Sequence, residues 1–321
     1  MRAAYVERFD AEHPLNGLVI GERPMPSTPE GWVRIKVVAA SLNHHDLSSL
    51  RGGEALRRRG GAGLTEADLP RILGMDAAGL TDDGREVIAY PIISQSGSFG
   101  VLSGRYDGAL AEYVVIPQEN LVPKPPTLSF EQAACLPTAW LTAYRMLFEK
   151  ADIPAGGSFL VQGASGAVAT ALIILGKAAG FRVWVTGRSL ESREFALRIG
   201  ADAAFEPGAQ MPERVHAVMD VVGAPTWPHS LKCLRRSGVL VVPGAVSGYA
   251  ATVDIVRLFT MDLRIVGTAM GSYQQLAQLA EFCASRKLEI PIDRIVPLIE
   301  VPNAFAAMDE GRLRGKAVIR L

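Results

Sequence analysis

Cysteine, net charge and long apolar runs are all scarce in this 321-residue sequence. Its three cysteines, Cys135, Cys233 and Cys283, are widely separated. Because no CxxC pair exists, the sequence predicts neither a disulfide scaffold nor a thiolate zinc cluster. Basic and acidic residues number 33 each, so the formal net charge is zero. A neutral chain lacks the basic surface that nucleic acid or an anionic membrane attracts, and we expect neither as a partner.

The sequence also lacks the apolar segments of secreted and membrane proteins. No uninterrupted apolar run approaches the length of about 18 residues that indicates a bilayer span. The run at 168–179 is short, and Lys177 interrupts it. The first residues, MRAAYVERF, have no signal-peptide pattern and indicate a strand. We therefore expect a cytoplasmic protein in a reducing environment, without a membrane segment.

Length and composition indicate a globular protein of two domains. Apolar residues form 49% of the chain and charged residues 21%, proportions typical of globular proteins. Residues 1–120 contain short apolar runs at 33–40, 86–92 and 111–116, each bounded by turn-forming residues. This pattern predicts a β-rich first domain. A proline-rich stretch at 117–126 marks its end.

Residues 121–290 alternate between apolar strands and helices. Strands are predicted at 159–162, 182–186, 203–205, 217–222, 239–242 and 263–266, with helices at 167–179 and 190–199. Strands that are apolar throughout indicate a parallel sheet covered on both faces. The predicted fold class is therefore α/β, a Rossmann doubly wound parallel sheet domain that binds a dinucleotide. Residues 291–321 return to extended segments, and we expect the strand beginning at Lys316 to rejoin the first domain.

A glycine-containing turn follows the first strand of the 121–290 domain and opens a helix. Gly163 permits a tight turn, Gly166 lets the backbone approach a pyrophosphate, and Ser165 offers a hydroxyl donor. The helix N-terminus adds unpaired amides and the positive end of its dipole. An ordinary strand–helix turn is the alternative. The predicted phosphate cradle consists of Gly163, Ala164, Ser165, Gly166, Ala167 and Val168.

The second strand of this domain ends in Thr186, Gly187, Arg188 and Ser189. A protein that binds NAD usually has an acidic residue here, which accepts hydrogen bonds from the ribose hydroxyls. Arginine instead forms charge-assisted bonds to phosphate, each worth about 1.5–3 kcal/mol. The sequence therefore predicts NADPH, with residues 187–189 at its extra phosphate. The alternative for Arg188 is a solvated surface side chain.

Motifs along essentially the whole chain resemble the medium-chain dehydrogenase/reductase superfamily. Beyond residues 163–169 and 187–189, they are SLNHHD at 41–46, GMDAAG at 74–79, DGALAEY at 107–113, PTAWLTAY at 137–144, LRIGAD at 197–202 and DVVG at 220–223. The resemblance is to zinc-free, quinone oxidoreductase-like members. It implies a GroES-like catalytic domain made of residues 1–120 and 291–321, with the Rossmann domain inserted at 121–290.

The same resemblance implies where zinc enzymes of this superfamily hold their catalytic metal. The matching positions are Asn43, Met75 and Thr138. An amide, a thioether and a hydroxyl make a poor site, because zinc favours thiolate, imidazole or carboxylate ligands. Residues 91–106, where those enzymes carry a four-cysteine lobe, contain no cysteine. We therefore expect no zinc of either kind, and a structural role for Asp76.

The resemblance also implies candidate catalytic residues. His45 occupies a position that relays a proton in the zinc enzymes, although packing or substrate contact is an alternative. Two adjacent histidines on an extended segment face opposite sides, so His44 and His45 cannot easily share a metal. The catalytic candidates are Asn43, His45 and Thr142. Cofactor contacts are expected from Asn43, His44, Thr138, Thr142, Val222, Gly223, Gly244, Ala245 and Ala269, and substrate contacts from Met75, Tyr90, Trp140 and Met270.

Taken together, the motifs imply an NADPH-dependent oxidoreductase that reduces a quinone, an enone or a related conjugated carbonyl. A hydrogen-bond donor would steady the developing oxyanion. The alternatives are a metal-dependent alcohol or aldehyde reductase using His44, His45 and Asp46, a non-catalytic NADPH-binding sensor or partner protein, and an enoyl-thioester reductase with the arginines at 57–59 as its carrier site. The resemblance further implies a homodimer, formed by edge strands near Val253 and Leu263.

Overall fold

The computed structural model describes residues 1–52, 63–95 and 98–321. The arginines at 57–59 lie outside these described residues. The chain divides into two compact units. Unit 1 contains Met1–Thr138, Leu276–Lys287 and Ile292–Leu321, and unit 2 contains Ala139–Gln275 and Leu288–Pro291. Unit 1 therefore includes residues 121–138 and 276–287, which the sequence assigned to the nucleotide domain.

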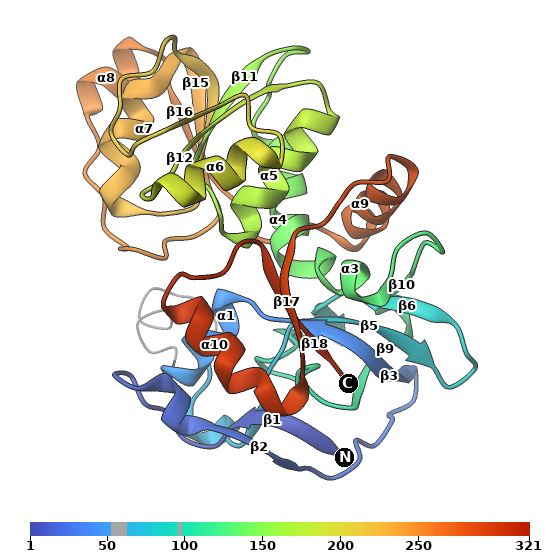
Figure 1. Cartoon of the computed structure of the whole chain (residues 1–321). Coiled ribbons are helices and arrows are strands. Elements are labelled where there is room, and N and C mark those ends of the chain that lie inside the picture. Colours follow the sequence, from blue (N-terminus) through green and yellow to red (C-terminus); the bar gives the residue numbers. More distant parts are fainter. Residues whose placement is uncertain (53–62, 96–97) are drawn as a thin grey trace. The chain divides into compact units, whose positions relative to one another are not determined.

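Unit 1 is built on a mostly antiparallel seven-stranded sheet of order β10-β6-β5-β3-β18-β17, with β9 also paired to β3 (Figure 1). Its strands are β3 (Trp32–Ser41), β5 (Asp76–Thr81), β6 (Glu86–Ala89), β9 (Tyr113–Pro117), β10 (Leu121–Pro123), β17 (Ile292–Pro297) and β18 (Lys316–Arg320). Smaller sheets are formed by β2 (Leu18–Glu22), β1 (Arg2–Val6) and β4 (Arg71–Ile72), and by β7 (Ile92–Gln95) and β8 (Ser98–Val101).

The last strand, β18, rejoins the first part of the chain, as the sequence predicts. It pairs with β3, and Val318 lies opposite Ser41. On the other side of β3, Asp76 of β5 also lies opposite Ser41. This register brings the beginnings of β5 and β18 to the end of β3. Residues far apart in sequence, Asp76 and Lys316, therefore start the two strands that flank β3, at one corner of the sheet.

The segment after β3 is helical, so the prediction that His44 and His45 lie on an extended chain is wrong. Helix α1 (His44–Leu50) begins directly after Asn43. The Asp46 carboxylate accepts a hydrogen bond of 2.9 Å from the Asn43 N–H, which is half of a capping box and starts the helix here. Among the described residues, the other helices of this unit are α3 (Phe130–Ala134), α10 (Val301–Asp309), η1 (Pro14–Gly17), η2 (Glu66–Asp68), η3 (Gln118–Asn120) and η7 (Leu298–Glu300).

Unit 2 contains a parallel six-stranded sheet of order β13-β12-β11-β14-β15-β16 (Figure 1). The strands are β11 (Ser158–Gln162), β12 (Arg182–Thr186), β13 (Ala203–Phe205), β14 (Val215–Asp220), β15 (Leu234–Val242) and β16 (Arg264–Gly267). Counted along the chain, the spatial order is third, second, first, fourth, fifth, sixth, which is the doubly wound dinucleotide-binding order. Every residue of β11 is buried, as a central parallel strand requires. The predicted fold class is confirmed.

Helices connect the strands of this sheet. They are α5 (Ala167–Ala178), α6 (Leu190–Arg198), η6 (Ala224–Thr226), α7 (Trp227–Cys233) and α8 (Ile255–Thr260), preceded by α4 (Leu141–Arg145) and η5 (Met146–Lys150). Two further helices, η4 (Leu136–Trp140) and α9 (Tyr273–Ser285), cross the boundary between the units. Strand β14 ends at Asp220, before the predicted end at 222, because the Asp220 carboxylate accepts bonds from the N–H groups of Val222 and Gly223 and turns the chain. Over the described ranges, no helix is both long and apolar enough to cross a membrane.

Candidate functional site

In unit 2, the loops that follow the parallel strands meet at one edge of the sheet. Strands β11 and β14 are neighbours at which the strand order reverses, and such sheets bind ligands outside the carboxyl ends of these strands. The Gly163 N–H donates to the Thr186 carbonyl oxygen (3.1 Å), and the Ser247 N–H donates to the Val222 carbonyl oxygen (2.9 Å). The fold therefore brings together the predicted cofactor residues of four separate loops.

The turn between β11 and α5 has the geometry of an anion cradle. Gly163 has a φ of 104°, a conformation that favours glycine. Gly166 directly precedes α5. The space beside its Cα is unfilled, since a Cβ there would meet no atom within 4 Å. No side chain caps the first amides of α5. These amides are available to a pyrophosphate, so the residues present fit the predicted dinucleotide.

The end of β12 is the position predicted to bind the extra ribose phosphate of NADPH. Gly187 leaves no room for a side chain, because a Cβ would lie 2.8 Å from the Ser192 Oγ. Ser189 caps α6 by accepting the Ser192 N–H (3.1 Å). Arg193 is committed elsewhere, to the Gly187 carbonyl oxygen (2.8 Å) and to Glu206 (3.2 Å). Arg188 is exposed, and within the described part of the chain it makes no ion pair.

Asp220 organises the loop after β14, a role that sequence reasoning did not assign. Its buried carboxylate accepts the N–H groups of Val222 and Gly223, both at 3.0 Å, through Oδ1. Its Oδ2 accepts the hydroxyls of Thr226 (2.8 Å) and Ser230 (2.7 Å). Four donors thus hold a carboxylate under the loop that carries two predicted cofactor residues. The DVVG motif was visible in the sequence, but the spatial placement of Ser230 was not.

In unit 1, the corner formed by β3, β5 and β18 holds a buried polar cluster. The Lys316 ammonium, on a residue only 1% exposed, donates to the Leu42 carbonyl oxygen (2.7 Å), Asn43 Oδ1 (2.8 Å) and Asp76 Oδ2 (3.0 Å). Asp76 Oδ2 also accepts from Asn43 Nδ2 (2.8 Å). Thr138 donates to Asp76 Oδ1 at 2.5 Å. Sequence reasoning named two of these residues, Asn43 and Thr138, for the site and Asp76 for structure, and it missed Lys316.

This cluster does not fit a zinc ion. Asn43 offers an amide and Thr138 offers a hydroxyl as candidate ligands. Both groups already donate hydrogen bonds to Asp76. Met75 offers a thioether, a poor ligand for zinc. An ammonium already neutralises Asp76, and a dication placed beside Lys316 would meet its positive charge. We therefore derive no chemistry from a metal at this position.

The two histidines of α1 do not converge with Asp46 on a shared site. Asp46 Oδ1 accepts the Gly74 N–H (3.0 Å) and the Ser103 hydroxyl (3.2 Å). Burial raises the pKa of Asp46, while nearby His45 opposes that shift. Desolvation by the surrounding protein lowers the pKa of His44, although part of the residue contacts solvent. The positive charge of Lys316 lowers this pKa further. His45 is half-buried, and its Nε2 has no hydrogen-bond partner in the described residues. A catalytic role for His45 stays a prediction.

The remaining predicted residues are distributed over both units. Thr142 lies on α4 and is 7% exposed. Met75 and Trp140 are buried, whereas Tyr90 and Met270 are half-buried. Gly244 and Ala245 lie in the loop after β15, and Ala269 lies in the loop after β16. Their contacts with a cofactor or substrate stay predictions.

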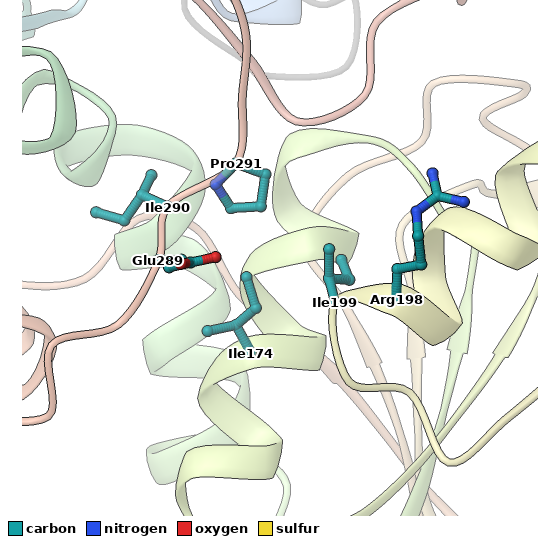
Figure 2. Close-up of a pocket in the computed structure, with 6 residues that line it drawn as sticks. All are labelled: Ile174, Arg198, Ile199, Glu289, Ile290 and Pro291. Carbon is teal, nitrogen blue, oxygen red and sulfur yellow. The ribbon is translucent and has the colours of Figure 1, made fainter.

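A hollow of about 360 Å³ elsewhere in unit 2 lies apart from these residues (Figure 2). It is lined by Ile174 of α5, Arg198 and Ile199 at the end of α6, and Glu289, Ile290 and Pro291. None of them is a predicted site residue. The hollow lies beside the C-terminal end of α6, whereas the phosphate cradle lies at the N-terminal end of α5. It therefore does not belong to the candidate site.

Comparisons with known proteins agree with this geometry. Residues 29–126 match the alcohol dehydrogenase GroES-like domain, and residues 167–285 match the zinc-binding dehydrogenase family. The 2-methylene-furan-3-one reductase of Solanum lycopersicum is 32% identical over 313 residues, which cover 92% of this chain and 73% of that protein. The chloroplastic NADPH-dependent alkenal/one oxidoreductase of Arabidopsis thaliana is 29% identical with the same coverage.

Among solved structures, an NAD-dependent alcohol dehydrogenase superimposes with a TM-score of 0.89 at 28% identity, and 100% of both chains is covered. Similar proteins thus include reductases of conjugated carbonyls and alcohol dehydrogenases. The chain belongs to the medium-chain dehydrogenase/reductase superfamily and is an oxidoreductase that uses a nicotinamide nucleotide.

Proposed function

We propose that this protein is an NADPH-dependent reductase of quinones, enones or related conjugated carbonyls, and that it works without zinc. The observation that carries the proposal is the buried cluster around Asp76. It offers an amide, a hydroxyl and an ammonium where the zinc enzymes of the superfamily hold their metal. Without a metal, an isolated carbonyl is weakly polarised. A conjugated carbonyl spreads the developing negative charge, and a hydrogen-bond donor is enough to stabilise it.

The end of β12 supports NADPH over NADH. Residues 186–190 contain no carboxylate that would accept hydrogen bonds from the ribose hydroxyls. Arg188 is exposed beside the loop, with its guanidinium available for a phosphate. A ribose phosphate placed here would meet a positive charge and the hydroxyl of Ser189.

The chain's own residues bind and orient the reactants. The amides at the start of α5 would hold the pyrophosphate, and Arg188 would hold the ribose phosphate. Asp220 fixes the Val222–Gly223 backbone, which we expect to border the ribose. A bound nicotinamide supplies the hydride. In unit 1, Asn43 Nδ2 retains one hydrogen beyond its bond to Asp76, and we expect it to face the acceptor oxygen.

An acceptor panel tests the proposal directly. Purified protein is assayed for NADPH and NADH oxidation with a quinone, a short enone, crotonyl-CoA and a saturated aldehyde, each with and without a zinc chelator. We expect NADPH oxidation with the quinone or the enone, unchanged by the chelator. Alcohol or aldehyde turnover that the chelator abolishes would support the metal-dependent alternative. Saturable NADPH fluorescence without any consumption across the panel would support a non-catalytic binding protein.

We also propose that unit 2 forms a homodimer through its sheet edge. Strand β16 ends the six-stranded sheet, and Ile265 on it is 36% exposed. On α8, Ile255, Val256 and Phe259 are 64%, 63% and 69% exposed. An edge strand beside exposed apolar side chains is a template for pairing with a second copy. Val253 and Leu263, named from the sequence, are themselves directed into the core of this unit.

A further inference from the structure

The orientation of the Asn43 amide is fixed by two charged groups. Its oxygen lies 2.8 Å from the Lys316 ammonium, which can only donate. Its nitrogen lies 2.8 Å from the Asp76 carboxylate, which can only accept. Rotating the amide by half a turn would place the NH₂ group against the ammonium and the carbonyl against the carboxylate. Both contacts would then be repulsive, so only one orientation is compatible with the cluster.

Asn43 would otherwise have another use for its side chain. It precedes α1, where asparagine commonly accepts a hydrogen bond from a backbone N–H of the first helical turn. Here the side chain makes no such bond, and the Asp46 N–H donates to the Asn43 carbonyl oxygen instead (3.0 Å). The amide is thus committed to the buried cluster rather than to the helix. One hydrogen on Nδ2 has no acceptor in the described residues, and Asn43 is 7% exposed.

We propose that Lys316 is a positioning residue, which holds the Asn43 amide so that its remaining Nδ2 hydrogen points to the acceptor oxygen. The inference rests on the proposed reduction of a conjugated carbonyl and assigns the donor in that reaction. All three hydrogens of the ammonium are used by Leu42, Asn43 and Asp76, so Lys316 itself does not reach the substrate. Its effect passes through Asn43. The strand register places it there, because Val318 of β18 lies opposite Ser41 at the end of β3, and the Leu42 N–H donates to the Ala317 carbonyl oxygen (3.0 Å).

The main test compares two buried lysines of unit 1. Lys124 is 8% exposed and, like Lys316, bonds to a backbone carbonyl, that of Leu128 (2.6 Å), and to a carboxylate, that of Glu86 (2.9 Å). We expect Lys316→Met to lower kcat for the enone at least tenfold while the Kd for NADPH changes less than twofold. Lys124→Met should lower the melting temperature but leave kcat within twofold. Equal kcat values in the two variants would overturn the proposal.

A double-mutant cycle separates positioning from a general structural role. If Lys316 acts through Asn43, then Lys316→Met should change kcat less than twofold in an Asn43→Ala background. If the two substitutions lower kcat by amounts that are fully additive in free energy, the proposal is contradicted. Lys316→Met leaves the buried Asp76 carboxylate without its cation. The second form of the test is therefore the double variant Lys316→Met/Asp76→Asn, which buries no unpaired charge. A folded double variant with the kcat of the original protein would also contradict it.

The wild-type protein supplies a measurement that needs no variant. A buried, hydrogen-bonded ammonium exchanges its hydrogens slowly, so ¹⁵N NMR should resolve a slowly exchanging Nζ signal for Lys316. Its absence would overturn the inference even if no variant folds. The acceptor panel separates the two proposals. If the protein reduces an enone and Lys316→Met reduces it equally fast, only the positioning role fails. If no conjugated carbonyl is reduced, the proposed function fails first.

Discussion

We propose that Arg188 binds the single phosphate by which NADPH differs from NADH. It is exposed at the end of β12 and follows a glycine that admits no side chain. We expect Arg188→Glu to raise the KM for NADPH at least tenfold and to spare the KM for NADH. The reason is the loss of a charge-assisted bond worth about 1.5–3 kcal/mol, together with new repulsion of the phosphate. Steady-state kinetics with both nucleotides measure the effect.

The matched control is Arg198→Glu, which makes the same change of charge at the end of α6. Arg198 is exposed as well, and it stacks near the Phe195 ring at 5.8 Å. Arg198→Glu should leave both KM values within about twofold, since an exposed charge at the other end of α6 interacts only weakly with the nucleotide. If the two variants weaken NADPH alike, Arg188 does not contact the phosphate.

Sequence reasoning named Arg188 as a candidate site residue but not Lys316, and the difference is one of distance along the chain. Arg188 stands beside the glycine and serine that mark a strand end, so its neighbours identify it. The partners of Lys316 are 240 and 273 residues away, at Asp76 and Asn43. Only the pairing of β18 with β3 brings them together. A lysine near the end of a chain is usually solvated, and nothing local indicated that this one is buried.

At the scale of elements, the loop after β14 depends on one glycine. Gly223 has a φ of 113° and a ψ of −151°, a region that is essentially restricted to glycine. A Cβ there would lie 2.8 Å from the Gly248 carbonyl oxygen. We expect Gly223→Ala to lower the free energy of unfolding by about 2 kcal/mol or more. The substitution should also raise the Kd for NADPH, because the loop after β14 would move away from the backbone at Gly248. Urea unfolding and fluorescence titration measure the two effects.

Gly208→Ala is the control for backbone strain alone. Gly208 also has a positive φ, 81°, but a Cβ there would meet no atom within 4 Å. Its substitution should cost about 1 kcal/mol and leave NADPH affinity unchanged. Equal changes in NADPH affinity for the two variants would show that the loop geometry at Gly223 does not matter for binding.

Elements of the Rossmann domain with a clear apolar or periodic pattern were predicted closely, whereas the short helix α1 was not. The predicted helices at 167–179 and 190–199 correspond to α5 and α6 to within one residue. Helix α1 was taken as extended because its seven residues, HHDLSSL, give little periodicity. Its start depends on a carboxylate bonding back three residues, a signal that was present in the Asn43–Asp46 spacing but was not recognised.

At the scale of the molecule, the scarcity of cysteine has a chemical consequence. All three thiols are buried, and burial raises the pKa of Cys135 to about 12, that of Cys233 to about 11 and that of Cys283 to about 12. Because the thiolate is the reactive form, we expect almost no reaction with a disulfide reagent at pH 8 in the folded protein. Three equivalents should react after unfolding in guanidinium. A thiol that titrates within minutes in the folded protein would contradict this.

The proposed dimer is tested by a single charge on α8. Phe259→Asp places a carboxylate on a face that we expect to be covered, so it should shift the protein from dimer to monomer. Phe99→Asp is the control, because Phe99 is 66% exposed and belongs to unit 1, whereas the proposed interface is made of residues of unit 2. Light scattering after gel filtration gives the masses. A monomeric original protein, or a dimeric Phe259→Asp variant, would exclude this interface.

The sequence by itself determined the classes of structure and chemistry. Apolar strands alternating with helices specify a parallel sheet, and a glycine turn before a helix specifies an anion cradle. Both depend on neighbouring residues, so both are visible in the linear chain. The missing zinc ligands are likewise visible, as an asparagine, a methionine and a threonine at matching positions.

Only the tertiary structure decided which groups occupy the corner where those ligands would stand. Strand register places Asp76 and Lys316 on either side of Ser41 and Asn43, and burial forces the two charges to pair. A buried ammonium needs carbonyl or carboxylate partners, and the chain supplies them from β5 and from the turn after β3. Such a cluster follows from long-range pairing, which no local pattern encodes.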